Sequence, residues 1–291
     1  MGLNKEELIN LLRTNPDEFN KYKNENPDAE IDLSDSDLTH LDLHDLNLNN
    51  ANLSNSNLSG SKLNNARINN ANLTNTDFRN VVMHNAEIKN SDLTGSDMDW
   101  AELTNTDFSD SILNSAKLTR TNIENSNLTN VELSNSTLNK AFLTNCNLSK
   151  SKLTESNLYW TDISNANLSQ ADLSNVNLEK ADLRNSILTE CNLENATLFW
   201  CDLTKSDLNA ANLSNANLEK TILKNCNLEG ANLTQANLIN ADLKNANLKD
   251  AKLDKANLEQ TDLRGAILTG STINIANNLL NANIDKTTVM P

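Results

Sequence analysis

Apolar residues recur at every fifth position along most of this chain. Reading every fifth residue from Leu33 to Ile273 gives 49 consecutive positions, occupied by 40 Leu, 5 Ile, 2 Phe and 2 Met. A second series lies two residues before these positions, and its 45 members from Ala51 to Ser271 are all Ala, Ser, Thr, Cys or Val. A period of five matches neither the helical repeat nor the strand repeat. The chain must therefore bend every five residues, with a large and a small side chain of each segment turned inward.

Tandem blocks such as ANLSN, ADLRN and ANLTQ resemble the pentapeptide-repeat family over residues 31 to 289. The resemblance implies an all-β solenoid, a right-handed quadrilateral β-helix in which four pentapeptides complete one coil of twenty residues. Coils that stack at about 4.8 Å satisfy the backbone laterally and leave open edges only at the two ends. The repeat region then corresponds to about 13 coils and a length of about 60 Å.

Residues 1–30 do not follow the repeat and predict a short α-helical cap, which divides the chain into a cap over 1–30 and a β-helix over 31–291. Asn4 and Glu7 form a typical helix-capping pair, and Asn15-Pro16 is typical of the start of a second helix. A solenoid needs such a cap over its first coil. Three bulky residues replace small ones in that coil and are expected to contact the helices: Ile31, Leu41 and Leu46.

The five-residue register changes once, near the end of the chain. Asn278 falls on the position that the apolar series would occupy, and one added residue starts a new series of Leu279, Ile284 and Val289. We expect these three residues to continue the interior.

Composition narrows the classes of function. The net charge of −15 disfavours direct binding of nucleic acid, because phosphates would be repelled. The sequence has no apolar run long enough to span a membrane, and its first residues do not resemble a secretory signal. The expected location is therefore the cytoplasm, without membrane association.

Residues with catalytic or ligand-binding chemistry follow the repeat instead of forming sites. The four cysteines all occupy the small inward series, which indicates that they fill space like alanine: Cys146, Cys191, Cys201 and Cys226. His44 and His84 lie two coils apart, about 10 Å, which is too far to share a metal ion. We therefore expect no catalytic residues, no cofactor and no metal, and a protein that is not an enzyme.

Asparagine dominates the fifth position of the units. One column of this position contains Asn65, Asn85, Asn105 and seven further residues, of which only Lys205 is not Asn. Asparagine tolerates turn geometry, and stacked amides can bond to one another. We expect a ladder of amides along this column.

The three tryptophans all lie at multiples of twenty, so in a twenty-residue coil they share one outward column. With aromatic residues at neighbouring positions they form a candidate interaction edge: Trp100, Phe142, Tyr159, Trp160, Phe199 and Trp200. Contiguous exposed aromatic area usually marks an interface. The alternative is a stabilising ladder, in which Lys180 stacks between Trp160 and Trp200 through cation–π contacts.

Two functions follow from these features. The first is a non-catalytic scaffold that binds a protein partner, or a second copy of itself as a homodimer, through the aromatic edge. The second comes from the resemblance, since some similar proteins bind type II topoisomerases and protect them from quinolones: an acidic DNA mimic that binds DNA gyrase and modulates or protects it. Its candidate stripe is one acidic column, Asp42, Glu102, Asp162, Asp182, Asp202, Asp242 and Asp262. Duplex DNA of about 60 Å would carry roughly 35 charges, far more than this chain.

Overall fold

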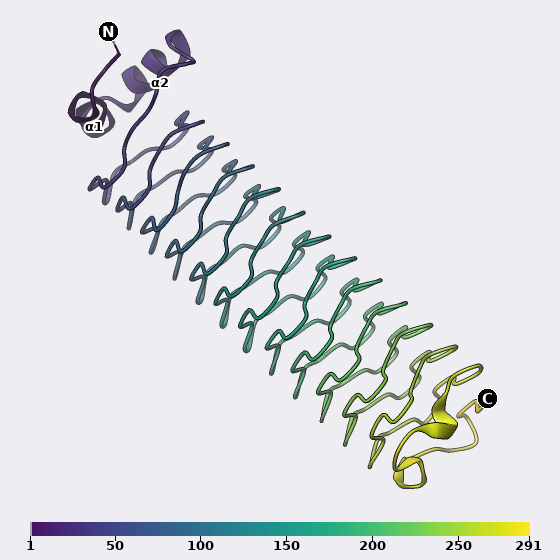
Figure 1. Cartoon of the computed structure of the whole chain (residues 1–291). Coiled ribbons are helices and arrows are strands. Elements are labelled where there is room, and N and C mark those ends of the chain that lie inside the picture. Colours follow the sequence, from purple (N-terminus) through teal and green to yellow (C-terminus); the bar gives the residue numbers. More distant parts are fainter. Residues whose placement is uncertain (1) are drawn as a thin grey trace. The chain divides into compact units, whose positions relative to one another are not determined.

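The computed structural model describes residues 2–291 and divides the chain into two compact units, residues 1–142 and 143–291. Within each unit the backbone forms stacked coils of a right-handed quadrilateral β-helix (Figure 1). Parallel bridges join the second residue of a pentapeptide to the residue twenty positions later, as in Asn52 to Asn72 and Asp182 to Asp202. The fold class that the family resemblance implies is confirmed.

Backbone hydrogen bonds explain why a five-residue unit is stable. The N–H of the central residue donates to the next coil, as from Leu33 to the carbonyl of Asn52 at 2.7 Å. The N–H of the small residue donates across the bend, as from Ala51 to Leu48 at 3.1 Å. The fifth residue adopts the left-handed conformation, with a φ of 57° at Asn175. Asparagine is tolerated in that conformation far better than most residues, which accounts for its frequency at this position.

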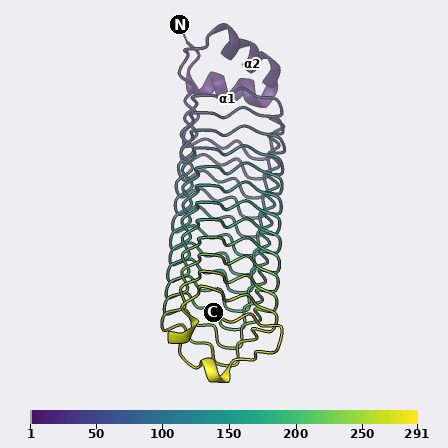
Figure 2. The same cartoon turned by 90° about the vertical axis from the view of Figure 1, so that its right-hand side faces the viewer.

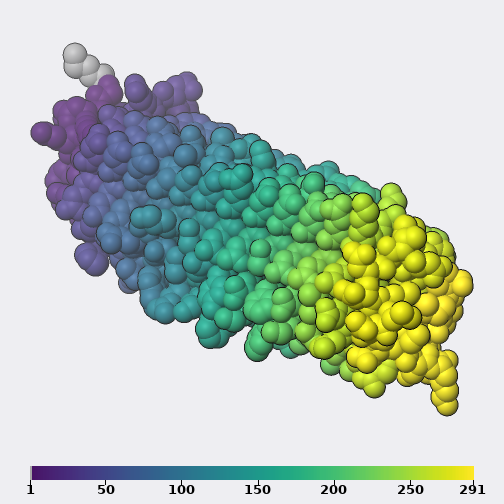
Figure 3. Space-filling view, turned by 60° about the horizontal axis from the view of Figure 1, so that its bottom comes forward, coloured from purple at the N-terminus to yellow at the C-terminus, as the bar shows by residue number. Residues whose placement is uncertain are grey.

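The interior is assembled as the repeat predicts. All 49 apolar positions from Leu33 to Ile273 are buried, and the small series from Ala51 to Ser271 is buried with them. On the face visible in Figure 3, side chains of successive coils lie against one another without a deep cleft. The inward assignment of both series is confirmed in each unit.

The amide ladders lie mainly at the second position of the repeat, not at the fifth. In the second unit Asn212 donates to Asn192, and Asn232 to Asn212, both at 3.0 Å. At the fifth position of the first unit, Asn65 donates to Asp45 at 2.9 Å and Asn75 donates to Asn55 at 3.4 Å. The expected fifth-position ladder of that column stays a prediction, and the left-handed backbone gives a further reason for the preference for asparagine there.

Two helices cover the first coil of the first unit: α1 (Lys5–Thr14) and α2 (Pro16–Glu25) (Figure 2). The Asn4–Glu7 capping pair begins α1 as expected. The side chains of Arg13 and Asn20 donate to backbone carbonyls of the first coil at 2.7 and 3.1 Å. Of the three bulky residues beneath the helices, Ile31 and Leu46 are fully buried and Leu41 is partly exposed. The domain boundary at residue 30 stays a prediction.

The last coil of the second unit departs from the expected register. It contains two short 3-10 helices, η1 (Ile273–Ile275) and η2 (Leu279–Asn281). Asp262 pairs with Asn283 and Ile267 with Val289, so two residues have been added by the end of the coil, not one. Val289 therefore lies opposite an outward residue, and both it and Ile284 are about half exposed. The prediction that Leu279, Ile284 and Val289 continue the interior is wrong, because the added residues shift the register of the coil.

None of the helices in residues 2–291 combines the length and the apolar character that crossing a membrane requires.

Candidate functional site

Two pairs of aromatic side chains project from one face of the second unit. Tyr159 packs edge-on against Trp160, with ring centroids 6.4 Å apart, and Phe199 packs at a tilt against Trp200 at 6.0 Å. The bridges from Asn157 through residue 177 to residue 197 place the two pairs on the same face, two coils apart. Trp160 and Trp200 are 59% and 56% exposed. We call these four residues the paired-aromatic stripe.

The coil between the two aromatic pairs and the coil after the second pair each present a glutamate and a lysine at the same two positions. Lys180 lies 5.1 Å from the ring centre of Tyr159 and donates to its hydroxyl at 3.0 Å. This hydrogen bond, together with the adjacent Glu179 carboxylate at 3.4 Å, raises the pKa of Lys180. Tyr159 is thus a ring partner of Lys180, and the stacking of Lys180 between Trp160 and Trp200 stays a prediction.

Lys220 repeats this arrangement one aromatic pair later. Its ammonium lies 5.3 Å from the ring centre of Phe199 and 5.9 Å from that of Trp200, and 3.5 Å from the carboxylate of Glu219. Each lysine therefore covers part of an aromatic pair and is neutralised by its own neighbour.

The other two residues of the candidate interaction edge belong to the first unit. Trp100 is 53% exposed and carries the guanidinium of Arg120 at 4.4 Å from its ring centre. Its neighbour in the chain is Asp99, so it has no aromatic partner beside it. Phe142 is 47% exposed on an adjacent face and pairs through its backbone with Asn122. The structure brings the four residues of the second unit together in pairs and leaves these two apart from each other.

All three tryptophans occupy the fifth position of their units, where the backbone is left-handed. Their φ angles are 63° at Trp100, 57° at Trp160 and 60° at Trp200. A bulky side chain in this conformation costs about 1–2 kcal/mol relative to the right-handed regions, and only Gly, Asn and Asp adopt it routinely. The backbone itself therefore disfavours tryptophan at these three positions, which points to a role for the exposed ring.

The acidic column of the second unit is largely neutralised by bases in the next column. Arg184 contacts Asp182 at 2.5 Å, and Arg264 contacts Asp262 at 2.6 Å. The Arg264 guanidinium holds the pKa of Asp262 well below its usual range. The same column of bases supplies ion pairs from Lys224 to Asp242 at 3.1 Å and from Lys244 to Asp262 at 3.0 Å. The stripe is therefore mixed in charge and does not present a row of bare carboxylates.

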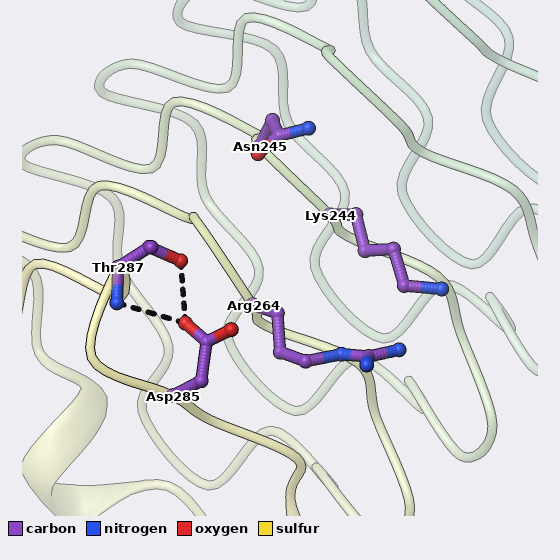
Figure 4. Close-up of a pocket in the computed structure, with 5 residues that line it drawn as sticks. All are labelled: Lys244, Asn245, Arg264, Asp285 and Thr287. Atoms are coloured by element: carbon purple, nitrogen blue, oxygen red, sulfur yellow. Dashed lines mark hydrogen bonds between the residues drawn. The ribbon is translucent and has the colours of Figure 1, made fainter.

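A shallow hollow of about 250 Å³ lies beside this column near the end of the second unit (Figure 4). It is lined by Lys244, Asn245, Arg264, Asp285 and Thr287. The backbone and hydroxyl of Thr287 both donate to the Asp285 carboxylate, and the two bases are held by Asp262. Its two bases are thus paired with a carboxylate outside the hollow, and its one carboxylate accepts hydrogen bonds from Thr287.

The four cysteines and His44 are the other side chains that could act as nucleophiles or ligands, and they are buried or hydrogen-bonded. All four cysteines are buried outside disulfides, and burial raises the pKa of Cys226 to about 12 and that of Cys201 further. Within residues 2–291 no three His, Cys, Asp or Glu side chains converge as metal ligands. His44 pairs with Asp42 at 2.8 Å, and this hydrogen bond raises the pKa of His44.

Sequence reasoning missed the carboxylates Glu179 and Glu219 of the stripe, and the ring contacts that Lys220 and Arg120 make. The signal was present in the column one position before the tryptophans. In the second unit that column strictly alternates apolar and acidic residues: Tyr159, Glu179, Phe199, Glu219, Ile239 and Glu259.

Comparison with known proteins supports the repeat and leaves the activity open. The family model "Pentapeptide repeats" matches eight copies between residues 31 and 270. No curated protein matches the sequence. HetL, a protein of Nostoc sp. strain PCC 7120 involved in heterocyst differentiation regulation, is 28% identical over 72% of this chain and 92% of its own, with a TM-score of 0.41.

Two further solved structures are similar to this chain. Rfr23 from the cyanobacterium Cyanothece 51142 is 35% identical over 48% of this chain and 64% of its own, with a TM-score of 0.15. A trypsin-treated form of QnrB1, a plasmid-mediated fluoroquinolone resistance protein, is 17% identical over 70% of this chain and 91% of its own, with a TM-score of 0.35.

Proposed function

The chain belongs to the pentapeptide-repeat family, and we propose that it is a non-catalytic scaffold that acts through protein–protein interaction. Proteins of this family are generally non-catalytic. The observation that carries the proposal is the paired-aromatic stripe, which exposes two tryptophans with an aromatic neighbour each. Exposed aromatic clusters of this kind are a common mark of binding surfaces, and tryptophan and tyrosine are enriched among the residues that dominate binding energy.

Backbone conformation supports binding over a purely structural role. Asparagine would suit the left-handed fifth position better than Trp160 or Trp200, so tryptophan there sacrifices local stability. The contacts that each ring makes within the unit leave more than half of its surface exposed. A side chain selected only for stability would be expected to bury more of its area.

The proposed partner is another protein or a second copy of this chain. We propose the cytoplasm as its location and no cofactor for its action, in keeping with the four free thiols.

A double substitution tests the proposal. In the Trp160→Ser, Trp200→Ser variant, self-association measured by analytical ultracentrifugation, or capture of a partner, should fall while the thermal midpoint barely moves. The matched control is Trp100→Ser, which removes an exposed tryptophan that has no aromatic neighbour. If the double variant instead loses about 1 kcal/mol or more of stability with association unchanged, the rings are a stabilising ladder and the proposal fails.

A gyrase-directed DNA mimic is the second candidate, and one observation favours it. Five coils of the second unit place an aspartate in one column: Asp162, Asp182, Asp202, Asp242 and Asp262. The bases beside this column weaken the case, because most of these carboxylates already have a cationic partner.

A supercoiling assay decides this second candidate. A mimic should inhibit DNA supercoiling by gyrase at micromolar concentration, and less at high salt because screening weakens surface charges. Removing the bases, as in Arg184→Ala with Arg264→Ala, should then strengthen inhibition. No inhibition by either protein at a large molar excess over the enzyme would exclude it.

A further inference from the structure

The paired-aromatic stripe repeats with a period of two coils. At the fourth position of the face, apolar residues alternate with glutamates, and at the fifth position each lysine follows a tryptophan. Ile239 continues the apolar alternation one period beyond Phe199. A partner that lies along the stacking direction therefore meets an apolar platform, a polar step, and an apolar platform again.

The polar steps are locally neutral. Lys180 is paired with Glu179 at 3.4 Å and Lys220 with Glu219 at 3.5 Å. A surface of this kind gives little advantage to an acidic or a basic ligand, because neither charge is left unmatched. It favours a ligand that binds by contact with aromatic faces and by hydrogen bonds.

The spacing between platforms selects among peptide conformations. Coils stack at about 4.7–4.9 Å, so the two aromatic pairs lie about 9.4–9.8 Å apart along the stack. A polyproline-II helix has three residues per turn and rises about 3.1 Å per residue, so one edge recurs every 9.3 Å or so. Side chains on one face of a β-strand recur at about 6.6–6.8 Å, and positions seven apart on an α-helix at about 10.5 Å. The polyproline-II repeat is the best match.

We propose that the stripe binds a proline-rich segment in the polyproline-II conformation, lying along the stack. Prolines three residues apart would pack on Tyr159 with Trp160 and on Phe199 with Trp200. Proline-rich segments are bound elsewhere by aromatic-lined grooves, which exploit a conformation that is already ordered before binding. Within residues 2–291 the indole N–H of Trp200 donates no hydrogen bond, so it can reach a carbonyl of such a segment. This inference rests on the proposed function and names the class of partner.

Binding of synthetic peptides to the full chain tests the proposal directly. Fluorescence polarisation of labelled decaproline should show saturable binding that changes little with salt. Affinity should rise sharply between triproline and pentaproline, because a triproline of about 6 Å reaches one aromatic pair and a pentaproline of about 12 Å reaches both. A glycine–serine peptide of equal length, which is a flexible coil, should bind far more weakly.

Single substitutions locate the binding site. Trp160→Ser and Trp200→Ser should each weaken decaproline binding about tenfold, while Trp100→Ser should leave it within a factor of two or so. Circular dichroism of each variant establishes that the β-helix is retained. Equal binding by all three variants would place the peptide elsewhere and overturn the proposal.

The two proposals fail in different ways. If no proline peptide binds at millimolar concentration while the Trp160→Ser, Trp200→Ser variant still loses self-association, the stripe is an interface for another occupant and only the polyproline inference falls. Preferential binding of a helical peptide of the EAAAK type would overturn it in favour of a helix. If neither peptide binding nor association responds to the substitutions, the proposed function falls as well.

Discussion

The two units have the same interior and differently decorated outer faces. Both bury a large residue at the centre of every pentapeptide and a small one beside it. On the outside, Trp100 of the first unit stands next to Asp99 and is covered by Arg120 at 4.4 Å. Trp160 and Trp200 of the second unit each stand next to another aromatic residue.

This difference separates two roles for the same residue at the same repeat position. A tryptophan under a guanidinium forms a self-contained contact within its unit. Two tryptophans with aromatic neighbours, repeated every second coil, form the exposed stripe on which the proposed binding rests. The repeat explains the fold of both units, and the residues beside each tryptophan decide what the outer face can bind.

Thiol labelling should separate the two units most clearly, because all four cysteines lie in residues 143–291. Burial raises the pKa of Cys226 from 9.0 to about 12, which lowers its thiolate fraction about a thousandfold near neutral pH. We expect no thiol of the folded protein to react promptly with Ellman's reagent, and all four to react once the second unit unfolds.

An exposed cysteine in the first unit serves as the positive control. Ser115→Cys places a thiol at an exposed position of that unit and should react at once. Prompt reaction of a native cysteine would show that the interior of the second unit opens more readily than its burial indicates.

The interiors should respond alike to overpacking. Ala71→Leu in the first unit and Ala171→Leu in the second each add volume to a buried small position, which typically costs about 1–3 kcal/mol. Urea unfolding followed by circular dichroism should show similar losses for both variants. The exposed control Glu155→Asn should change stability by no more than about 0.5 kcal/mol. A loss confined to one unit would break the equivalence of the two interiors.

Replacing a tryptophan by asparagine should change the stability least, and the size of the change should differ between Trp100 and Trp200. Asparagine relieves the left-handed backbone, which offsets the loss of ring contacts worth about 0.5–1 kcal/mol. Trp200→Asn should therefore be neutral or slightly stabilising. Trp100→Asn should be less favourable by about 0.5 kcal/mol, since Arg120 lies closer to its ring than Lys220 does to that of Trp200.

Thermal midpoints measured under identical conditions are sufficient for this comparison. A marked destabilisation by Trp200→Asn would mean that the stripe is held mainly for stability.

Much of the fold was predictable because every pentapeptide has the same bend and the same two inward positions. The inward series follows from spacing, and the helical cap follows from its Asn4–Glu7 capping pair. The contacts of Lys180 and Lys220 did not follow, because a long side chain can reach several neighbours in the adjacent coils. Whether Lys180 lies over Tyr159 or over a tryptophan depends on a hydroxyl acceptor and a nearby carboxylate, not on register.

The sequence by itself determined the bend every five residues and the two inward series, because a strict five-residue period gives every pentapeptide the same register. Only the tertiary structure decided how the ends and the outer faces are arranged. At the last coil one extra residue lies between Asn277 and Asn283, in the segment that contains η2, and a second lies between Asn283 and Val289. On the outer faces, nearby acceptors and rings compete for each lysine side chain. This competition places Lys180 over Tyr159, and Lys220 over Phe199 and Trp200.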